Sequence, residues 1–202
     1  RNNVLTDFIN TGTYDINREF YCTNSPSMDI LISSNLERLL YHLSGDDGDT
    51  VSDLMEKLEK DKKYTVSDRI RDGLSCFAAG YADEGETEEA IARMYDENGY
   101  LIDTHTAVAY KVYEDYRKET GDETPTVIAS TASAYKFAAS VAKALGMPEE
   151  ADGFAYVRAL HEKTGVPVPS GLKDLEKKEI RHKDVIDKSE MKKTVADCLK
   201  QL

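Results

Sequence analysis

Hydroxyl-bearing side chains gather in the stretch 126–137, which reads TVIASTASAYKF. Its β-branched start predicts a short buried strand at 127–128, and the apolar residues that follow at helical spacing predict a helix that ends at Gly146. The hydroxyls, among them Thr131, would then lie at a strand-to-helix turn. Small ligands bind at such turns in parallel α/β sheets, because hydroxyls and free helix N–H groups are available together. The stretch therefore predicts a ligand site, and helix capping by Ser133 is the structural alternative.

A second group of polar residues surrounds the start of another predicted helix. Asp103 can cap this helix, which leaves His105 and Thr106 in its first turn. The helix dipole at that position favours a neutral imidazole. The alternative to a functional histidine is a packed, hydrogen-bonded histidine of the core.

A third group stands at 34–38. Ser34 and Glu37 have the spacing of a capping box, which predicts a helix start near Asn35. Free backbone N–H groups there, with Arg38 one turn further, could hold an anion, although most capped helix starts bind only water. The preceding residues 13–28 show little periodicity and include Ser25 and Ser27, a composition typical of a functional loop or of a plain surface connection.

The charge and cysteine content exclude several classes of function. The 202 residues include 26 Lys and Arg against 38 Asp and Glu, a net charge of −12, which disfavours nucleic acids and anionic membranes as partners. The 3 cysteines have no CxxC spacing, so neither a disulfide framework nor a metal site is indicated, and a cytoplasmic location is expected. No apolar run reaches the roughly 18 residues of a membrane span. Because the chain begins with Arg1, we expect it to be part of a longer protein.

Periodicity predicts a chain rich in helices. One further strand is predicted at Tyr64–Val66. The remaining predicted helices cover or begin at the following positions: 4–9, Thr50, 70–77 with an end near Gly80, 87–95, a helix opened by Pro148 with an end at Gly165, and Met191.

Three short motifs resemble those of serine β-lactamases: Ser133 to Lys136 as SxxK, Ser33 to Asn35 near SDN, and Lys163 to Gly165 as KTG. In that family the SxxK motif comes first along the chain and the KTG motif lies on a strand. Here the order differs, and the KTG residues are predicted to end a helix. We therefore reject an acyl-enzyme mechanism.

Four longer stretches together resemble one family, the threonine synthases: NVLTDFINTG at 3–12, TNSPSMDILISSNLER at 23–38, IDTHTAV at 102–108 and STASAYKF at 130–137. The resemblance runs from Asn2 into the C-terminal tail and matches the C-terminal portion of the family. It implies a pyridoxal 5'-phosphate enzyme, a carbon–oxygen lyase that converts O-phospho-L-homoserine and water to L-threonine and phosphate in threonine biosynthesis.

The catalytic lysine of that family is not among these residues. The Ser-Phe-Lys-Asp motif with the Schiff-base lysine and the Gly-Asn-Phe-Gly phosphate loop lie upstream of the matched region, and neither occurs here. The resemblance therefore implies no catalytic residue in this chain, no cofactor binding by the chain alone, and no activity of the chain alone. A non-catalytic, threonine-synthase-like binding or regulatory module is the alternative.

The resemblance assigns one residue to the cofactor. Thr131 matches the threonine of the family's Ser-Thr-Ala motif and should face the pyridine nitrogen, where a neutral hydroxyl moderates the ring as an electron sink. For the substrate phosphate the candidates are Ser34, Asn35 and Arg38, since a guanidinium binds phosphate bidentately. Ser25, Ser27, His105 and Thr106 are expected near the site.

Two prolines usual in the family are absent. Ala134 and Tyr135 stand where it usually has a proline-containing pair, and Thr104 replaces the proline of Asp-Pro-His. Their loss loosens two turns.

The expected architecture is α/β and helix-rich, the C-terminal part of the large domain of the tryptophan-synthase-like fold (fold type II), with only a few strands. Residues 1–165 are assigned to that cofactor-binding domain and 166–202 to a charged extension with a terminal helix. Because other strands of the sheet would lie upstream, we expect self-association through an exposed sheet edge.

Overall fold

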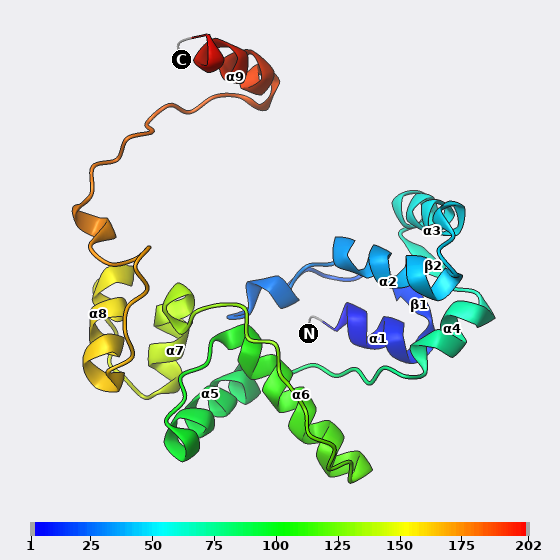
Figure 1. Cartoon of the computed structure of the whole chain (residues 1–202), viewed down its shortest axis with the longest axis horizontal. Coiled ribbons are helices and arrows are strands. Elements are labelled where there is room, and N and C mark those ends of the chain that lie inside the picture. The colour runs from blue at the N-terminus through cyan, green and yellow to red at the C-terminus, as the bar shows by residue number, and fades with distance from the viewer. Residues whose placement is uncertain (1–2, 201–202) are drawn as a thin grey trace. The chain divides into compact units, whose positions relative to one another are not determined.

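A computed structural model describes residues 3–200 (Figure 1). The chain divides into two compact units, Arg1–Pro169 and Ser170–Leu202. The second unit holds η3 (Leu175–Lys177), η4 (Lys188–Glu190) and α9 (Met191–Leu199). None of its described residues, 170–200, is buried, whereas the first unit contains the buried core and all the candidate site residues.

The first unit begins with helices packed around a small sheet. Its elements are α1 (Val4–Thr11), β1 (Thr13–Asp15), η1 (Pro26–Met28), α2 (Ser34–Ser44), α3 (Gly48–Asp61), β2 (Lys63–Thr65) and α4 (Asp68–Leu74). The strands β1 and β2 pair antiparallel, with Tyr14 opposite Tyr64. Their stacked rings pack with Phe8 of α1 at the centre of a hydrophobic core that also takes leucines from α2, α3 and α4.

The rest of the first unit is helical. Its elements are α5 (Glu84–Asn98), α6 (Thr104–Thr120), η2 (Ala134–Phe137), α7 (Ala138–Ala144) and α8 (Gly153–Thr164). Helix α5 packs against α6 and α7, and α7 packs against α8. Ile91 of α5, Val141 of α7 and Leu160 of α8 are fully buried. The fold is helix-rich with few strands, as predicted.

Local signals placed several helix ends correctly. Gly12 and Gly165 adopt left-handed conformations directly after α1 and α8, and Gly146 does so one residue after the C-cap of α7. Asp103 caps α6 and accepts the N–H groups of its first turn, as predicted. The predicted strand at Tyr64–Val66 forms one residue earlier, as β2.

The strand predicted at 127–128 does not form. Residues 121–131 contain no helix or strand, and Val127 is 95% exposed rather than buried. A strand needs a neighbour for its backbone N–H and C=O groups, and among residues 3–200 only β1 and β2 pair with each other. The β-branched residues have a high strand propensity, but the prediction of a buried strand at 127–128 was wrong for this chain.

The predicted helix starts at Thr50, Thr87 and Pro148 were wrong, the last because α8 begins at Gly153. The start predicted near Asn35 was right within one residue, but its predicted cap was wrong. Ser34 is the first residue inside α2 and makes no capping hydrogen bond, so no capping box forms with Glu37. Asp47 caps α3 in place of Thr50, and Asp83 caps α5 in place of Thr87 by a true capping box. Each aspartate lies three or four residues before the predicted position, and a carboxylate accepts the free N–H groups of the first turn.

The helix predicted to end near Gly80 ends at Leu74. Gly80 instead lies in an extended segment whose carbonyl accepts the hydroxyl of Thr6 at 2.7 Å. A Cβ at Gly80 would lie 2.9 Å from a methyl group of Val112. Close approach to α1 and α6 thus fixes this segment.

The strand β1, within the region 13–28 predicted as a loop, was missed because it is only three residues long and exists through its pairing with β2.

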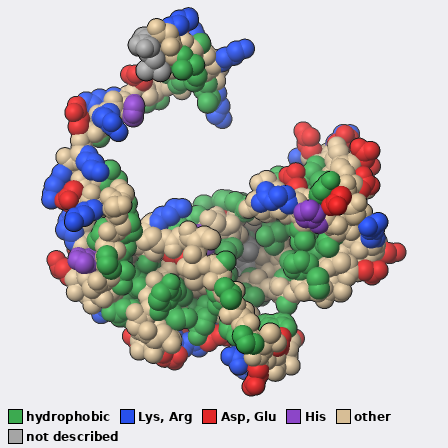
Figure 2. Space-filling model, viewed as in Figure 1, with side chains coloured by type: hydrophobic (Ala, Val, Ile, Leu, Met, Phe, Trp, Pro, Cys, Tyr) green, Lys and Arg blue, Asp and Glu red, His purple; other side chains and the backbone are tan. Residues whose placement is uncertain are grey.

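Hydrophobic side chains are also exposed on the first unit, as Figure 2 shows. Five large ones fall within thirteen residues: Phe20, Tyr21, Met28, Ile30 and Ile32, each 39–55% exposed. Exposed apolar side chains concentrated in this way mark a surface suited to contact with another element or molecule.

Candidate functional site

Asp103 lies at the centre of a buried hydrogen-bond network at the start of α6. The residue is 1% exposed, and its Oδ1 accepts the N–H groups of His105 at 2.9 Å and Thr106 at 3.4 Å. The same oxygen lies 3.1 Å from Nδ1 of His105, and Oδ2 accepts the hydroxyl of Thr106. A single carboxylate therefore caps the helix and also orients two side chains of its first turn.

His105 connects this network to a distant loop. Its Nε2 accepts the backbone N–H of Ser27 at 2.9 Å, and its ring packs on Phe137 with centroids 4.6 Å apart. Because Nε2 is an acceptor, the imidazole carries its proton on Nδ1, which faces Asp103. The side chain of His105 is only 13% exposed.

The loop joined to His105, residues 23–29, is held by its own polar contacts. Buried Asp29 accepts the N–H and the hydroxyl of Thr23, both at 2.7 Å. The hydroxyl of Ser25, which is 3% exposed, lies 3.4 Å from the carbonyl oxygen of Thr104. Ser25 and Ser27 are thus both attached to the start of α6.

Thr106 connects the network to the Ser-Thr-Ala motif. Its Oγ1 lies 2.9 Å from Oγ of Ser130. The Thr106 hydroxyl has one proton and donates it to Asp103, which as a carboxylate can only accept, so Ser130 donates to Thr106. Ser130 is therefore joined to the network by this hydrogen bond, although Ser130 and the next residue, Thr131, are both exposed.

Beyond Thr131 the chain forms η2. Ser133 accepts the N–H of Tyr135 at 3.3 Å, so for Ser133 the capping alternative holds. Tyr135 is buried and donates its hydroxyl to the carbonyl of Val166. Burial raises the pKa of Tyr135. The backbone N–H of Lys136 donates to the carbonyl of Ser133 at 2.9 Å, while the Lys136 ammonium lies 5.3 Å from the centroid of the Phe137 ring.

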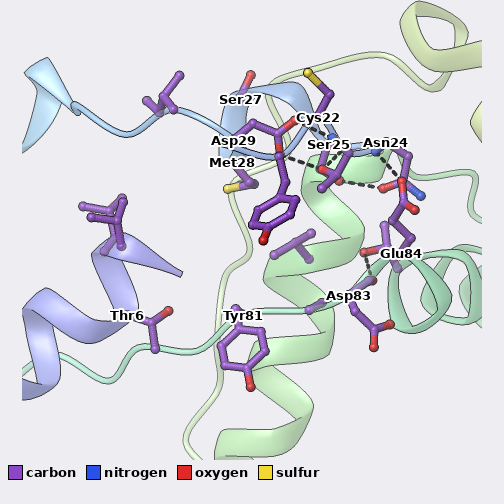
Figure 3. A pocket seen from close by; sticks show the side chains of 18 of the residues that line it. Thr6, Cys22, Asn24, Ser25, Ser27, Met28, Asp29, Tyr81, Asp83 and Glu84 are labelled. Atoms are coloured by element: carbon purple, nitrogen blue, oxygen red, sulfur yellow. Dashed lines mark hydrogen bonds between the residues drawn. The ribbon is translucent and has the colours of Figure 1, made fainter. Parts of the chain in front are cut away.

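A cavity of about 680 Å³ opens beside loop 23–29 (Figure 3). Apolar side chains of α1 and α6 line it together with Asp83 and Glu84 at the start of α5. Glu84 accepts the N–H of Asn24 at 3.0 Å, which ties the loop to α5. Within the described part of the chain, Asn24 Nδ2 is a buried donor without a partner.

The three residues predicted to hold the substrate phosphate lie together but apart from this network. Ser34, Asn35 and Arg38 are exposed on the first turns of α2, and Arg38 Nη2 donates to Asn35 Oδ1 at 2.6 Å. No hydrogen bond of residues 3–200 links them to loop 23–29 or to His105. The structure thus brings Ser25, Ser27, His105 and Thr106 into one network.

Asp29 was not predicted as a site residue, and Ser130 was predicted only as one of the hydroxyls of the ligand turn, without a role of its own. Asp29 follows Ser27 in the SPSMD motif, and Ser130 directly precedes Thr131, so both stood inside quoted motifs. Their roles depend on hydrogen bonds that cannot be inferred from residue type alone. For residues 3–200, no group of three or more His, Cys, Asp or Glu side chains is arranged to hold a metal ion, and no helix is long and apolar enough to span a membrane.

Comparison with known proteins identifies the family. The family model described as "Threonine synthase, C-terminal" matches residues 106–195. The human protein "Threonine synthase-like 1" is 40% identical over 151 residues, which are 74% of this chain and 20% of that protein.

Two solved structures are similar to the chain. A yeast threonine synthase aligns with a TM-score of 0.80 and 29% identity over 100% of this chain and 41% of its own. A pyridoxal-phosphate-bound threonine synthase from Brucella melitensis aligns with a TM-score of 0.69 and 32% identity over 88% of this chain and 34% of its own. The chain thus spans between a fifth and about two fifths of the length of these relatives. The fold is that of part of a fold type II pyridoxal-phosphate enzyme, and the chain matches the C-terminal portion of the threonine synthases.

Proposed function

We propose that the chain is the C-terminal part of a threonine synthase that converts O-phospho-L-homoserine and water to L-threonine and phosphate. The observation that carries the proposal is the position of Thr131. This residue matches the family's Ser-Thr-Ala motif, and Ser130 before it is anchored to the buried Asp103 network. The contact of Ser130 with the network supports a defined position for the neighbouring hydroxyl of Thr131.

The residues at this turn fit pyridoxal phosphate. The hydroxyl of Thr131 is exposed and makes no hydrogen bond within residues 3–200, so it is available to the nitrogen of a pyridine ring. When bound, the cofactor supplies an electron sink for the substrate's carbon skeleton. Thr131 would hold the ring nitrogen without carrying a permanent charge, which distinguishes it from an aspartate in the same role.

The substrate phosphate is assigned to α2. Arg38, with Asn35 beside it, provides a guanidinium on an exposed face near a helix start where backbone N–H groups are free. Loop 23–29, with Ser25 and Ser27, and the start of α6, with His105 and Thr106, form the wall next to the cofactor turn. In this proposal residues 1–165 are part of the cofactor-binding domain and 166–202 extend from it.

The compartment proposed is the cytoplasm. Cys22, Cys76 and Cys198 are all unpaired and exposed, which suits a reducing environment.

A second candidate function is a threonine-synthase-like binding or regulatory module without this turnover. It is favoured by the higher identity to the human threonine synthase-like 1 protein, 40%, than to the two threonine synthase structures, 32% and 29%. The two candidates differ in the upstream sequence. A lysine motif and a Gly-rich phosphate loop there support the enzyme, and their absence supports the module.

The decisive experiment is phosphate release from O-phosphohomoserine by the protein translated with the sequence upstream of Arg1. We expect turnover that depends on pyridoxal phosphate, a loss of about a hundredfold in kcat for Thr131→Val, and substantial recovery for Thr131→Ser. The 202-residue chain alone should release no phosphate and show no visible absorbance of bound cofactor. Turnover by this chain alone, or an inactive longer protein, would contradict the proposal.

A further inference from the structure

We propose that Asp103 and His105 are positioning residues that couple loop 23–29 to the Ser130–Thr131 turn, so that the two walls of the site become ordered together. The inference deepens the proposed function, since it identifies what holds Thr131 in place. It rests on contacts among residues that are far apart in sequence.

The coupling passes through one carboxylate. Oδ1 of Asp103 faces the Nδ1–H of His105, and Oδ2 accepts the hydroxyl of Thr106. Both side chains are therefore oriented by the same buried group, which is 1% exposed. Rotation of this carboxylate would disturb both contacts at once, because in the interior no water can replace them at low cost.

Each of the two side chains then reaches a different wall. His105 accepts the N–H of Ser27, 78 residues away, at 2.9 Å, and Thr106 contacts the Ser130 hydroxyl, 24 residues away, at 2.9 Å. With Asp103 between them, these bonds form a continuous path from the 23–29 loop to the residue before Thr131. Local polar contacts hold the interior of the loop, but they do not connect it to the turn.

Another capping aspartate shows what is special here. Asp47 caps α3 and accepts two backbone N–H groups and the hydroxyl of Thr50, much as Asp103 does with Thr106. Asp47 is exposed, and its hydrogen bonds join it to residues at most four positions away in sequence. Helix capping therefore explains the backbone contacts of Asp103 but not the contacts that His105 and Thr106 make with distant segments.

The test is NMR on the 202-residue chain with His105→Phe. This change keeps a ring against Phe137 and removes the Nε2 acceptor and the Nδ1 donor. We expect amide exchange at Ser27 to accelerate about tenfold, and the backbone signals of Ser130 and Thr131 to shift although neither residue touches position 105 by a hydrogen bond. Thr106→Val removes the contact at the other end of the path and should shift the backbone signals of Ser27.

Two variants serve as controls. His42→Phe changes an exposed histidine that contacts Asp46, and it should leave the signals of Ser27 and Thr131 unchanged. His105→Gln offers an amide oxygen to Ser27 and should restore part of its protection, which a requirement for an aromatic ring alone would not produce.

The coupling is disproved if His105→Phe changes the signals of loop 23–29 alone and leaves those of Ser130 and Thr131 unchanged. It is also disproved if the signal shifts of the double variant equal the sum of the shifts caused by His105→Phe and by Thr106→Val. Unaltered exchange at fully buried Phe8 and Ile70 shows that the variant remains folded. Because no cofactor or substrate enters the measurement, its outcome is independent of whether the longer protein turns out to release phosphate.

Discussion

Tyr64 is the side chain whose ionisation the fold alters most clearly. It is 3% exposed, and its ring stacks on that of Tyr14 with centroids 5.4 Å apart and planes inclined by 11°. Burial, followed by the nearby hydroxyl of Tyr14 and carboxylate of Glu37, raises the pKa of Tyr64 far above its ordinary value. Burial also raises the pKa of Tyr14. The phenol hydroxyls of Tyr14 and Tyr64 therefore both keep their protons in the folded chain at neutral pH.

This shift predicts a loss of stability at alkaline pH. The folded pKa of Tyr64 lies above that of the unfolded chain, about 10, so the unfolded state releases the proton first as pH rises. The contribution is intact below pH 10 and is lost as pH rises above it. Thermal unfolding followed by circular dichroism between pH 8 and 12 should show this decline, and Tyr64→Phe should reduce it.

An exposed tyrosine provides the comparison. Tyr100 is 59% exposed, and Tyr100→Phe should leave the alkaline decline as it is in the unmodified chain. An equal effect of the two substitutions would show that burial of Tyr64 does not cause the pH dependence.

At the scale of elements, the predicted helices form from local signals, whereas the strand predicted at 127–128 does not form. Helix α2 presents Leu40, which is fully buried against the tyrosine core, whereas Val127 of the predicted strand is 95% exposed. Amphipathic helices satisfy their backbone internally and need only a surface to pack on. A strand requires hydrogen bonds from another strand.

The difference predicts unequal costs for two apolar substitutions. Leu40→Ala leaves a cavity in the core and should lower the free energy of unfolding by about 3 kcal/mol. Val127→Ser removes no buried contact and should change it by less than about 0.5 kcal/mol. Urea titration monitored by circular dichroism measures both. A cost at Val127 similar to that at Leu40 would mean that the 127–128 segment is buried in solution.

At the scale of the whole molecule, the described surface carries apolar side chains without cover. Phe20, Ile30 and Ile32 are each about half exposed, close in sequence to the site loop 23–29. The chain also spans at most about two fifths of the solved relatives to which it is similar. Surfaces of this kind favour association, since apolar area is removed from water when they meet.

We therefore expect the isolated chain to self-associate. Sedimentation velocity over a concentration series should show the average mass rising with concentration, and the triple variant Phe20→Ser, Ile30→Ser, Ile32→Ser should remain monomeric at tenfold higher concentration. Ile180→Ser, at an exposed position of the second unit, is the matched control and should behave like the unmodified chain. A monomer at all concentrations would contradict the expectation.

The sequence by itself determined the helices, most of their C-terminal ends, the Asp103 cap and the residue types of the site. These features depend on neighbours within a few positions: apolar spacing, a glycine that adopts a left-handed conformation, and a carboxylate beside free N–H groups. The quoted motifs likewise determined the family, and with it the expectation for Thr131.

Only the tertiary structure decided which of these residues meet. The pairing of Tyr14 with Tyr64, the bond from Ser27 to His105 and the contact between Thr106 and Ser130 join segments 24 to 78 residues apart. The exposure of Val127 was decided in the same way, by the absence of a pairing strand within residues 3–200. Local propensity cannot specify such contacts, because a hydrogen bond between distant segments depends on how the whole chain packs around both partners.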